Sequence, residues 1–127
     1  MSFGVTEPDA GTDTSRISTR AVDDGMGGFV VSGRKIWTSK ALESEVVLLL
    51  ARTDDVPEGA TGSARFGGLS LFLAELDPNY VDIRPIPKLG RNAVASCEVA
   101  YDELPVEGWR LVGERGRGFQ HILHGLN

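Results

Sequence analysis

The sequence contains a single cysteine, two histidines and no long hydrophobic run, and each scarcity removes a class of function. Because Cys97 has no second cysteine to pair with, an intrachain disulfide is excluded, and a buried structural thiol is the default interpretation. His121 and His124 lack the cysteine cluster or Glu-x-x-His partners that metal sites use, so we predict no metal site. The longest apolar run, 46–51, is far shorter than the roughly 20 residues that a membrane helix needs.

Positive charge is also scarce, with 13 Lys and Arg against 18 Asp and Glu, which gives a net charge of -5. A nucleic-acid-binding domain would carry a basic face, so nucleic acid is excluded as the main partner. The first residues show no charged stretch followed by an apolar one, so no signal peptide is predicted, and we expect a cytoplasmic protein without membrane insertion. The length of 127 residues is enough for one domain.

Turn-forming residues are frequent, with 16 glycines and 6 prolines spread along the chain, and short strand-like runs lie between them. Alternating or continuous apolar residues bounded by Gly, Pro and Asp are typical of β-strands. We predict turns at 23–28 and 32–33, and we expect the last strand to end at 102–105. The predicted strands are 3–6, 17–22, 29–31, 35–38, 46–52, 69–76, 80–86 and 97–101.

The pattern indicates a mainly β fold, because strands do not alternate with helices as they do in a doubly wound sheet. We predict a compact antiparallel β-barrel of about seven strands with the start of a helix at the C-terminus. Phe119, Ile122 and Leu126 recur at helical spacing, and the rest of the chain looks too short to cover this apolar stripe. The glycine-rich stretch 113–118 lacks the Gly-x-Gly-x-x-Gly order, so we interpret it as a flexible entry to that helix.

Two segments carry the features of a ligand site. In 5–13 (VTEPDAGTD) a strand runs into a loop in which hydroxyls can bond a ligand and a glycine allows close approach. In 33–39 (GRKIWTS) an indole that could cover a planar ring is followed by two hydroxyls. Taken alone, the first segment could equally be a capped turn, and the second a core tryptophan followed by a polar loop.

Together, in this order, the two segments resemble the signatures of the acyl-CoA dehydrogenase family. The resemblance continues through 69–73 (LSLFL), 88–91 (KLGR), 96–99 (SCEV) and the glycine-rich stretch up to Phe119. Family members have a helical domain, a middle β-domain and a C-terminal helical bundle, with FAD between the last two. The resemblance therefore implies a middle β-domain at 1–115 and the start of the C-terminal helical domain at 116–127.

The family pattern also implies roles for residues of the first segment. Phe3 stands where the family has an aromatic near the flavin, and Val5 and Thr6 would meet the pyrimidine side of the isoalloxazine. Gly11 and Thr12 would lie by the FAD pyrophosphate, and Thr12 also by the acyl-CoA.

In the second segment, the resemblance implies that Trp37 packs on the flavin while Thr38 and Ser39 follow its edge. The Ser39 hydroxyl would take the place of a Ser or Thr that hydrogen-bonds near N5, the atom that receives the hydride. A donor near the reduced flavin stabilises the negative charge that develops there, so hydroxyls suit this position.

The implied reaction is α,β-dehydrogenation of an acyl-CoA thioester, with hydride transfer to FAD. The family's general base is a glutamate of the C-terminal helical domain, so we assign no catalytic residue here and expect these residues alone to be inactive. For Glu7, Asp13, Glu43 and Glu45 we predict structural or surface roles. Implied partners are an acyl-CoA substrate, an electron-transfer flavoprotein or similar acceptor, and further copies of the parent enzyme in a dimer or tetramer.

Two alternatives stay open from the sequence. A relative that shares the β-domain, such as an acyl-CoA oxidase or a nitroalkane oxidase, differs in oxygen access and in its base, which are decided mainly outside these residues. A non-catalytic β-barrel binding module would use both motif segments only as turns.

Overall fold

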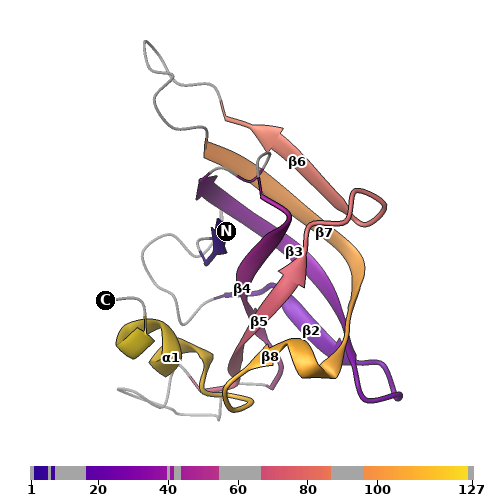
Figure 1. Cartoon of the computed structure of the whole chain (residues 1–127), viewed down its shortest axis with the longest axis vertical. Coiled ribbons are helices and arrows are strands. Elements are labelled where there is room, and N and C mark those ends of the chain that lie inside the picture. Colours follow the sequence, from indigo (N-terminus) through magenta and orange to yellow (C-terminus); the bar gives the residue numbers. More distant parts are fainter. Residues whose placement is uncertain are drawn as a thin grey trace.

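The computed structural model describes residues 2–5, 7, 17–39, 41, 44–54, 67–86 and 96–125. Eight strands form one sheet, and a short helix lies against the end where β5 begins and β8 runs (Figure 1). No helix in these ranges is long and apolar enough to cross a membrane. In chain order the elements are β1 (Ser2–Gly4), β2 (Arg20–Asp23), β3 (Phe29–Ser39), β4 (Val46–Arg52), β5 (Leu69–Glu75), β6 (Val81–Pro85), β7 (Ser96–Val106), the 3-10 turn η4 (Gly108–Arg110), β8 (Leu111–Val112) and α1 (Gly118–Gly125).

The sheet has the strand order β6-β7-β3-β2-β4-β5-β8, with β1 paired to β4 beside this path. The mainly β class with a C-terminal helix is confirmed. The sheet is open rather than a closed barrel, since the described parts of β6 and β8 do not pair with each other. It is also not purely antiparallel, because β1 runs parallel to β4 and β2 meets β4 in a parallel bridge.

Strands β3 and β7 are longer than the sequence pattern indicated, with 11 residues each. The turn predicted at Ser32 and Gly33 and the strand end predicted at 102–105 are corrected, because β3 and β7 stay paired through both stretches, Val31 with Leu104 and Gly33 with Tyr101. The register shifts there, and Glu103 adopts a left-handed φ of 51° while its N–H donates to Ser32 Oγ at 3.1 Å. Turn-forming residues serve here as a β-bulge inside a continuing strand.

The predicted Asp/Gly turn between β2 and β3 is confirmed as a tight hairpin. The carboxylate of Asp24 accepts the backbone N–H groups of Met26 and Gly28 at 2.7 and 3.0 Å. These hydrogen bonds hold the pKa of Asp24 below its usual value. Gly25 and Gly27 supply the left-handed backbone that such a turn requires, with φ of 81° and 87°.

The main hydrophobic core lies on the inner face of β3, β4, β5 and β7. The predicted buried strand 46–52 coincides with β4. Its two faces are both buried, with Leu49 in this core and Leu50 in a second cluster, which explains its continuous apolar run. Phe72 packs edge-to-face on Phe29, with ring centroids 5.0 Å apart. Cys97 is buried in this core, as expected. Its fully buried members include Val31, Val47, Leu49, Ala51, Phe72, Ala74, Cys97 and Val99.

The helix α1 packs onto a second, smaller cluster of apolar side chains. Phe119 and Ile122 lie on Ile17, Leu50 and Leu69. The expectation that nothing in the chain covers this stripe is therefore corrected for these two side chains. Apolar residues at helical spacing cover a neighbouring cluster, as the amphipathic pattern predicts.

The loop before α1 is fastened to the sheet, which corrects its interpretation as a flexible entry. The Arg115 guanidinium reaches both carboxylate oxygens of Asp23 at 3.2 Å and both of Asp54 at 3.1 Å. The backbone N–H of Gly116 donates to Ser70 Oγ at 2.9 Å. A planar guanidinium can bridge two carboxylates, so Arg115 holds the ends of β2 and β4 and the start of the helix together.

Candidate functional site

The predicted cofactor contacts fall partly within the described residues. Phe3, Val5 and Thr38 are described fully, and Trp37 and Ser39 are described by their backbone in β3. The predicted contacts at Thr6, Gly11 and Thr12 lie outside the described residues.

The structure brings the start of the chain beside the last part of β3 (Figure 1). Phe3 lies opposite Leu48 in the parallel pair of β1 and β4, and its ring is 45% exposed. The ammonium of Lys35 in β3 donates to the carbonyl oxygen of Val5 at 3.1 Å. The described residues of both motif segments are therefore in direct contact, although about 30 positions separate them along the chain.

A buried ion pair forms this contact. Lys35 is fully buried and Glu7 is 3% exposed, and the Lys35 ammonium lies 2.9 Å from Glu7 Oε2. That oxygen also accepts the backbone N–H of Thr19 at 2.9 Å. The other carboxylate oxygen accepts the backbone N–H and the hydroxyl of Ser18 at 2.7 and 3.0 Å. The carboxylate thus joins the N-terminal segment, β3 and the stretch that leads into β2.

Both members of the pair have shifted pKa values. Burial works to raise the pKa of Glu7, but the charge of Lys35 and the hydrogen bonds from Thr19, Ser18 and Lys35 outweigh it, so the pKa lies below its usual value. Burial lowers the pKa of Lys35 to about 8, against the opposing attraction of Glu7. At pH 7 both groups are therefore charged.

The shift of Lys35 predicts a rise in stability with pH. Between about pH 8 and the unperturbed lysine pKa of about 10.4, the unfolded chain binds more protons at Lys35 than the folded chain. We expect the free energy of unfolding to increase with pH in that window relative to Lys35→Met. Urea unfolding at about pH 7.5 and 9.5 measures this, below the range where Tyr101 titrates. A parallel pH dependence of the two proteins would contradict it.

Lys35 was not predicted as a site residue from the sequence, although it lies within the second motif segment. A structural role was predicted for Glu7, and the ion pair gives that role a definite form. The available signal was a lysine at the same two-residue period as Phe29, Val31 and Trp37, together with a glutamate inside the first motif segment. Buried charges need partners, so a lysine on a buried face calls for an acidic residue, but the sequence does not say which one.

The second motif segment also contains a break in the ladder between β3 and β7. Lys35 pairs with Val99 and Thr38 with Cys97, so Ile36 and Trp37 together oppose a single residue. Such β-bulges change the direction of side chains and are frequent next to functional sites. The tryptophan of the motif is therefore placed on an irregular stretch of an otherwise regular strand.

Buried hydroxyls with unused hydrogen-bonding capacity surround this junction. Among the described residues, Thr19 Oγ1, Thr38 Oγ1 and the Tyr101 hydroxyl have no hydrogen-bond partner. The side chain of Thr38 is 1% exposed, and burial raises the pKa of Tyr101. An unpaired buried polar group costs about 1–3 kcal/mol, so partners for these hydroxyls are expected.

Gly33 of the motif is required by close packing. A Cβ at this position would lie 2.4 Å from Thr19 Oγ1 and 2.6 Å from Thr19 Cα, and φ is 152°. The stretch that Glu7 holds therefore passes directly over the Gly33 backbone. Gly25, by contrast, has a φ of 81° but nothing within 4 Å of the corresponding Cβ position.

We expect Gly33→Ala to lower the free energy of unfolding by about 2–3 kcal/mol, because overpacking adds to backbone strain. Gly25→Ala carries only the strain and should cost about 1–2 kcal/mol. Thermal or urea unfolding of both variants measures the difference. Equal losses in free energy of unfolding would show that the close contact between Thr19 and Gly33 does not affect stability.

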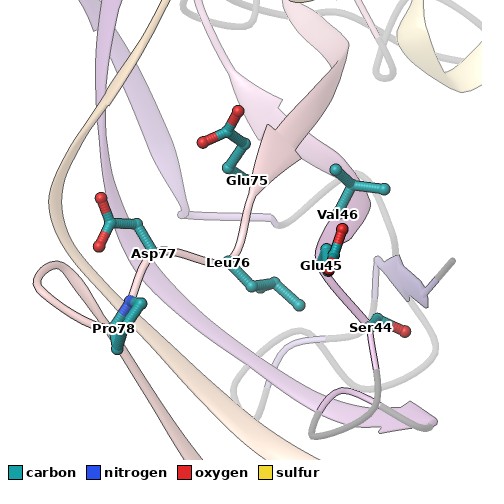
Figure 2. Close-up of a pocket in the computed structure, with 7 residues that line it drawn as sticks. All are labelled: Ser44, Glu45, Val46, Glu75, Leu76, Asp77 and Pro78. Atoms are coloured by element: carbon teal, nitrogen blue, oxygen red, sulfur yellow. The ribbon is translucent and has the colours of Figure 1, made fainter.

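A pocket among the described residues lies elsewhere, between the start of β4 and the end of β5. Figure 2 shows Ser44, Glu45 and Val46 on one side and Glu75 to Pro78 on the other. Its volume is about 470 Å³ and it contains none of the predicted cofactor contacts. Three carboxylates line it, so it is unsuited to the phosphate groups of FAD or coenzyme A.

Histidine has a structural role in the described part of the chain. The Nε2 atom of His121 accepts the backbone N–H of Glu114 at 3.2 Å and so fixes the loop before α1. Within the described ranges, no group of three or more His, Cys, Asp or Glu side chains could hold a metal ion.

Comparison with known proteins shows which family has this arrangement. The family profile for the acyl-CoA dehydrogenase middle domain matches residues 2–104. This chain belongs to the acyl-CoA dehydrogenase family. Members of this family are oxidoreductases that use FAD.

Relatives of this acyl-CoA dehydrogenase domain are similar along almost its whole length. The probable short/branched chain specific acyl-CoA dehydrogenase of Dictyostelium discoideum is 33% identical over 127 residues, covering 99% of this chain and 29% of the relative. The acyl-CoA dehydrogenase from Geobacillus kaustophilus has a TM-score of 0.83 at 29% identity, covering 96% of this chain and 31% of that one. The glutaryl-coenzyme A dehydrogenase glutaryl-CoA complex gives 0.81 at 32% identity, with coverage of 95% and 29%. The chain thus spans less than a third of these relatives.

The described residues of this acyl-CoA dehydrogenase domain fit the flavin of the family. An exposed aromatic ring at Phe3 suits contact with a planar cofactor. Thr38, one of the two residues expected at the edge of the flavin, has a hydroxyl without a partner among the described residues. The carbonyl oxygen of Val5 accepts a hydrogen bond from Lys35, which leaves one of its two lone pairs for another donor. The side chain of Thr38 is buried, so its hydroxyl lies below the protein surface rather than on it.

Proposed function

We propose that this chain is the flavin- and acyl-CoA-binding middle domain of an enzyme that dehydrogenates the α,β bond of an acyl-CoA thioester. The observation that carries the proposal is the junction of the two motif segments through Lys35, Val5 and Glu7. Family membership supports the reaction class. The glutaryl-CoA that one similar structure holds supports an acyl-CoA as the ligand.

Each motif residue has a proposed part in binding. Phe3 and Trp37 would contact the flavin ring, since flat aromatic surfaces stack on planar ligands. Val5 and Thr6 would meet its pyrimidine side. Thr38 and Ser39 would line its edge, with the Ser39 hydroxyl near the hydride-accepting atom.

The remaining loop residues would bind phosphate groups and substrate. Gly11 allows a ligand to approach the backbone closely, and Thr12 offers a hydroxyl to the FAD pyrophosphate and the acyl-CoA. FAD would supply the hydride acceptor, which no amino-acid side chain provides. The protein groups named here would bind and orient it.

Glu7, the described carboxylate of the first motif segment, is not suited to act as the general base. Glu7 is engaged by Lys35, Ser18 and Thr19, and it is buried, so it cannot take the α-proton of a substrate. We therefore propose that residues 1–115 are the middle domain, that 116–127 begin the helical domain, and that the base lies in that domain. On this view the 127 residues alone do not turn over substrate.

The proposed partners follow from the same assignment. The electron acceptor would be an electron-transfer flavoprotein or a similar protein, and the parent enzyme would form a dimer or tetramer. The predicted cytoplasmic location and the lack of a nucleic-acid partner belong to the same proposal.

Titration of FAD with the chain, followed by quenching of flavin fluorescence, tests the proposal. Trp37→Ala should weaken binding by about 2- to 12-fold, the equivalent of about 0.5–1.5 kcal/mol of lost stacking. Trp109→Ala is the matched control, because this indole is 70% exposed and stacks on Arg110 instead, with 4.3 Å between the guanidinium carbon and the ring centroid. Equal effects of the two variants would contradict the assignment of the site. Turnover of an acyl-CoA with an electron-accepting dye would contradict the absence of a base.

A further inference from the structure

We propose that Lys35 and Glu7 are positioning residues of the flavin site: the pair holds the first motif segment and the stretch 17–19 against β3, and so sets the shape of the pocket wall. This inference rests on the proposed function for its ligand. The contacts on which it is built are those of the protein alone.

The hydrogen bonds of the pair reach several segments of the chain. One ammonium serves both Val5, through its carbonyl, and Glu7, through its carboxylate, at 3.1 and 2.9 Å. The carboxylate in turn accepts from Ser18 and Thr19. Charge-assisted hydrogen bonds of this length are the stronger kind and hold their partners in fixed geometry. One pair therefore connects three chain segments: the first motif segment, the stretch 17–19 and β3.

Both side chains of the pair are buried. Replacing a buried ion pair by apolar side chains of similar volume is often neutral or stabilising, so stability alone does not explain charges at a site as dry as this. Lys35 touches the backbone of Val5, the residue whose peptide is proposed to meet the flavin. A cation on a peptide carbonyl polarises the whole planar peptide group and strengthens the N–H at its other end as a donor. The pair therefore orients the first motif segment and also tunes its hydrogen bonding.

The pair makes no contact with solvent through Lys35. Lys35 has no exposed surface, so its ammonium cannot touch substrate, and it acts through Val5 and Glu7. The next residue, Arg34, has its side chain 63% exposed and pairs with Glu98 at 3.1 Å. Arg34 and Lys35 are thus adjacent cations on one strand, of which only the second is placed to position the site.

The experiment compares two variants with the wild-type chain. Glu7→Gln with Lys35→Met removes both charges together and keeps the volume, so it can fold where Lys35→Met alone fails. Arg34→Met is the control, since it removes one positive charge from the neighbouring position. The readouts are the FAD dissociation constant and the hydrogen exchange of the Ser18 and Thr19 amides, compared with core amides of Val47 and Leu49.

We expect the double variant to keep core protection within about threefold of the wild type while FAD binds about tenfold more weakly, in line with the loss of a charge-assisted hydrogen bond. Exchange at Ser18 and Thr19 should be at least about tenfold faster relative to the core, and Arg34→Met should change neither readout. Wild-type FAD affinity in the double variant would overturn the inference. If the wild-type chain does not bind FAD, the flavin site requires the helical domain that the family places beside it, and the exchange data decide the inference alone: faster local exchange supports it, and unchanged exchange refutes it.

Discussion

Replacing Lys35 by Met is expected to lower the free energy of unfolding by about 3–5 kcal/mol, because it leaves the charge of Glu7 buried without its partner. Glu7 is 3% exposed, so water cannot take over the role of the ammonium. A domain of this size is stable by about 5–15 kcal/mol, so the loss removes a large part of its stability. Urea unfolding at pH 7, followed by tryptophan fluorescence, measures it.

Two further variants show whether the loss belongs to the buried pair. Arg34→Met breaks an exposed pair and should cost at most about 1 kcal/mol. Glu7→Gln combined with Lys35→Met should recover part of the loss, because no uncompensated charge then remains in the core. If the double variant were as unstable as the sum of two damaging single changes, the two residues would not act as a pair.

Truncation of Phe72 to Ala is expected to cost about 3–5 kcal/mol, the range for removing a large buried side chain and leaving a cavity. Phe72 is fully buried in β5 and packs edge-to-face on Phe29, on whose ring the guanidinium of Arg115 also lies at 5.7 Å. The cavity would therefore loosen the core and also the anchor of the loop before α1. Thermal unfolding and the near-ultraviolet circular dichroism of the aromatic residues report both effects.

Phe3→Ala is the matched control, the same chemical change at a ring that is 45% exposed. It should alter stability by less than about 0.5 kcal/mol, as surface substitutions usually do, yet weaken FAD binding if Phe3 contacts the flavin. A large loss of stability in Phe3→Ala with unchanged FAD binding would reverse the roles assigned to the two rings.

The sequence alone determined the class of the fold and the family. Apolar and β-branched runs separated by Gly, Pro and Asp are local signals, so β4 could be placed from its own residues and the hairpin turn from Asp24 and its glycines. The two motif segments indicated the acyl-CoA dehydrogenase family because their order and spacing are specific, whereas each segment alone could have been a turn.

Only the tertiary structure decided how β3 and β7 run and what holds the site together. Ser32, Gly33 and Asp102 are turn-forming residues by local preference, but cross-strand pairing keeps both strands going, and the predicted turn becomes a bulge. The pair of Lys35 and Glu7 joins residues about 28 positions apart, and no local pattern contains such a contact. The sequence shows that a lysine lies within a strand, but the fold chooses the partner that makes its burial tolerable, because only folding brings distant segments within hydrogen-bonding distance.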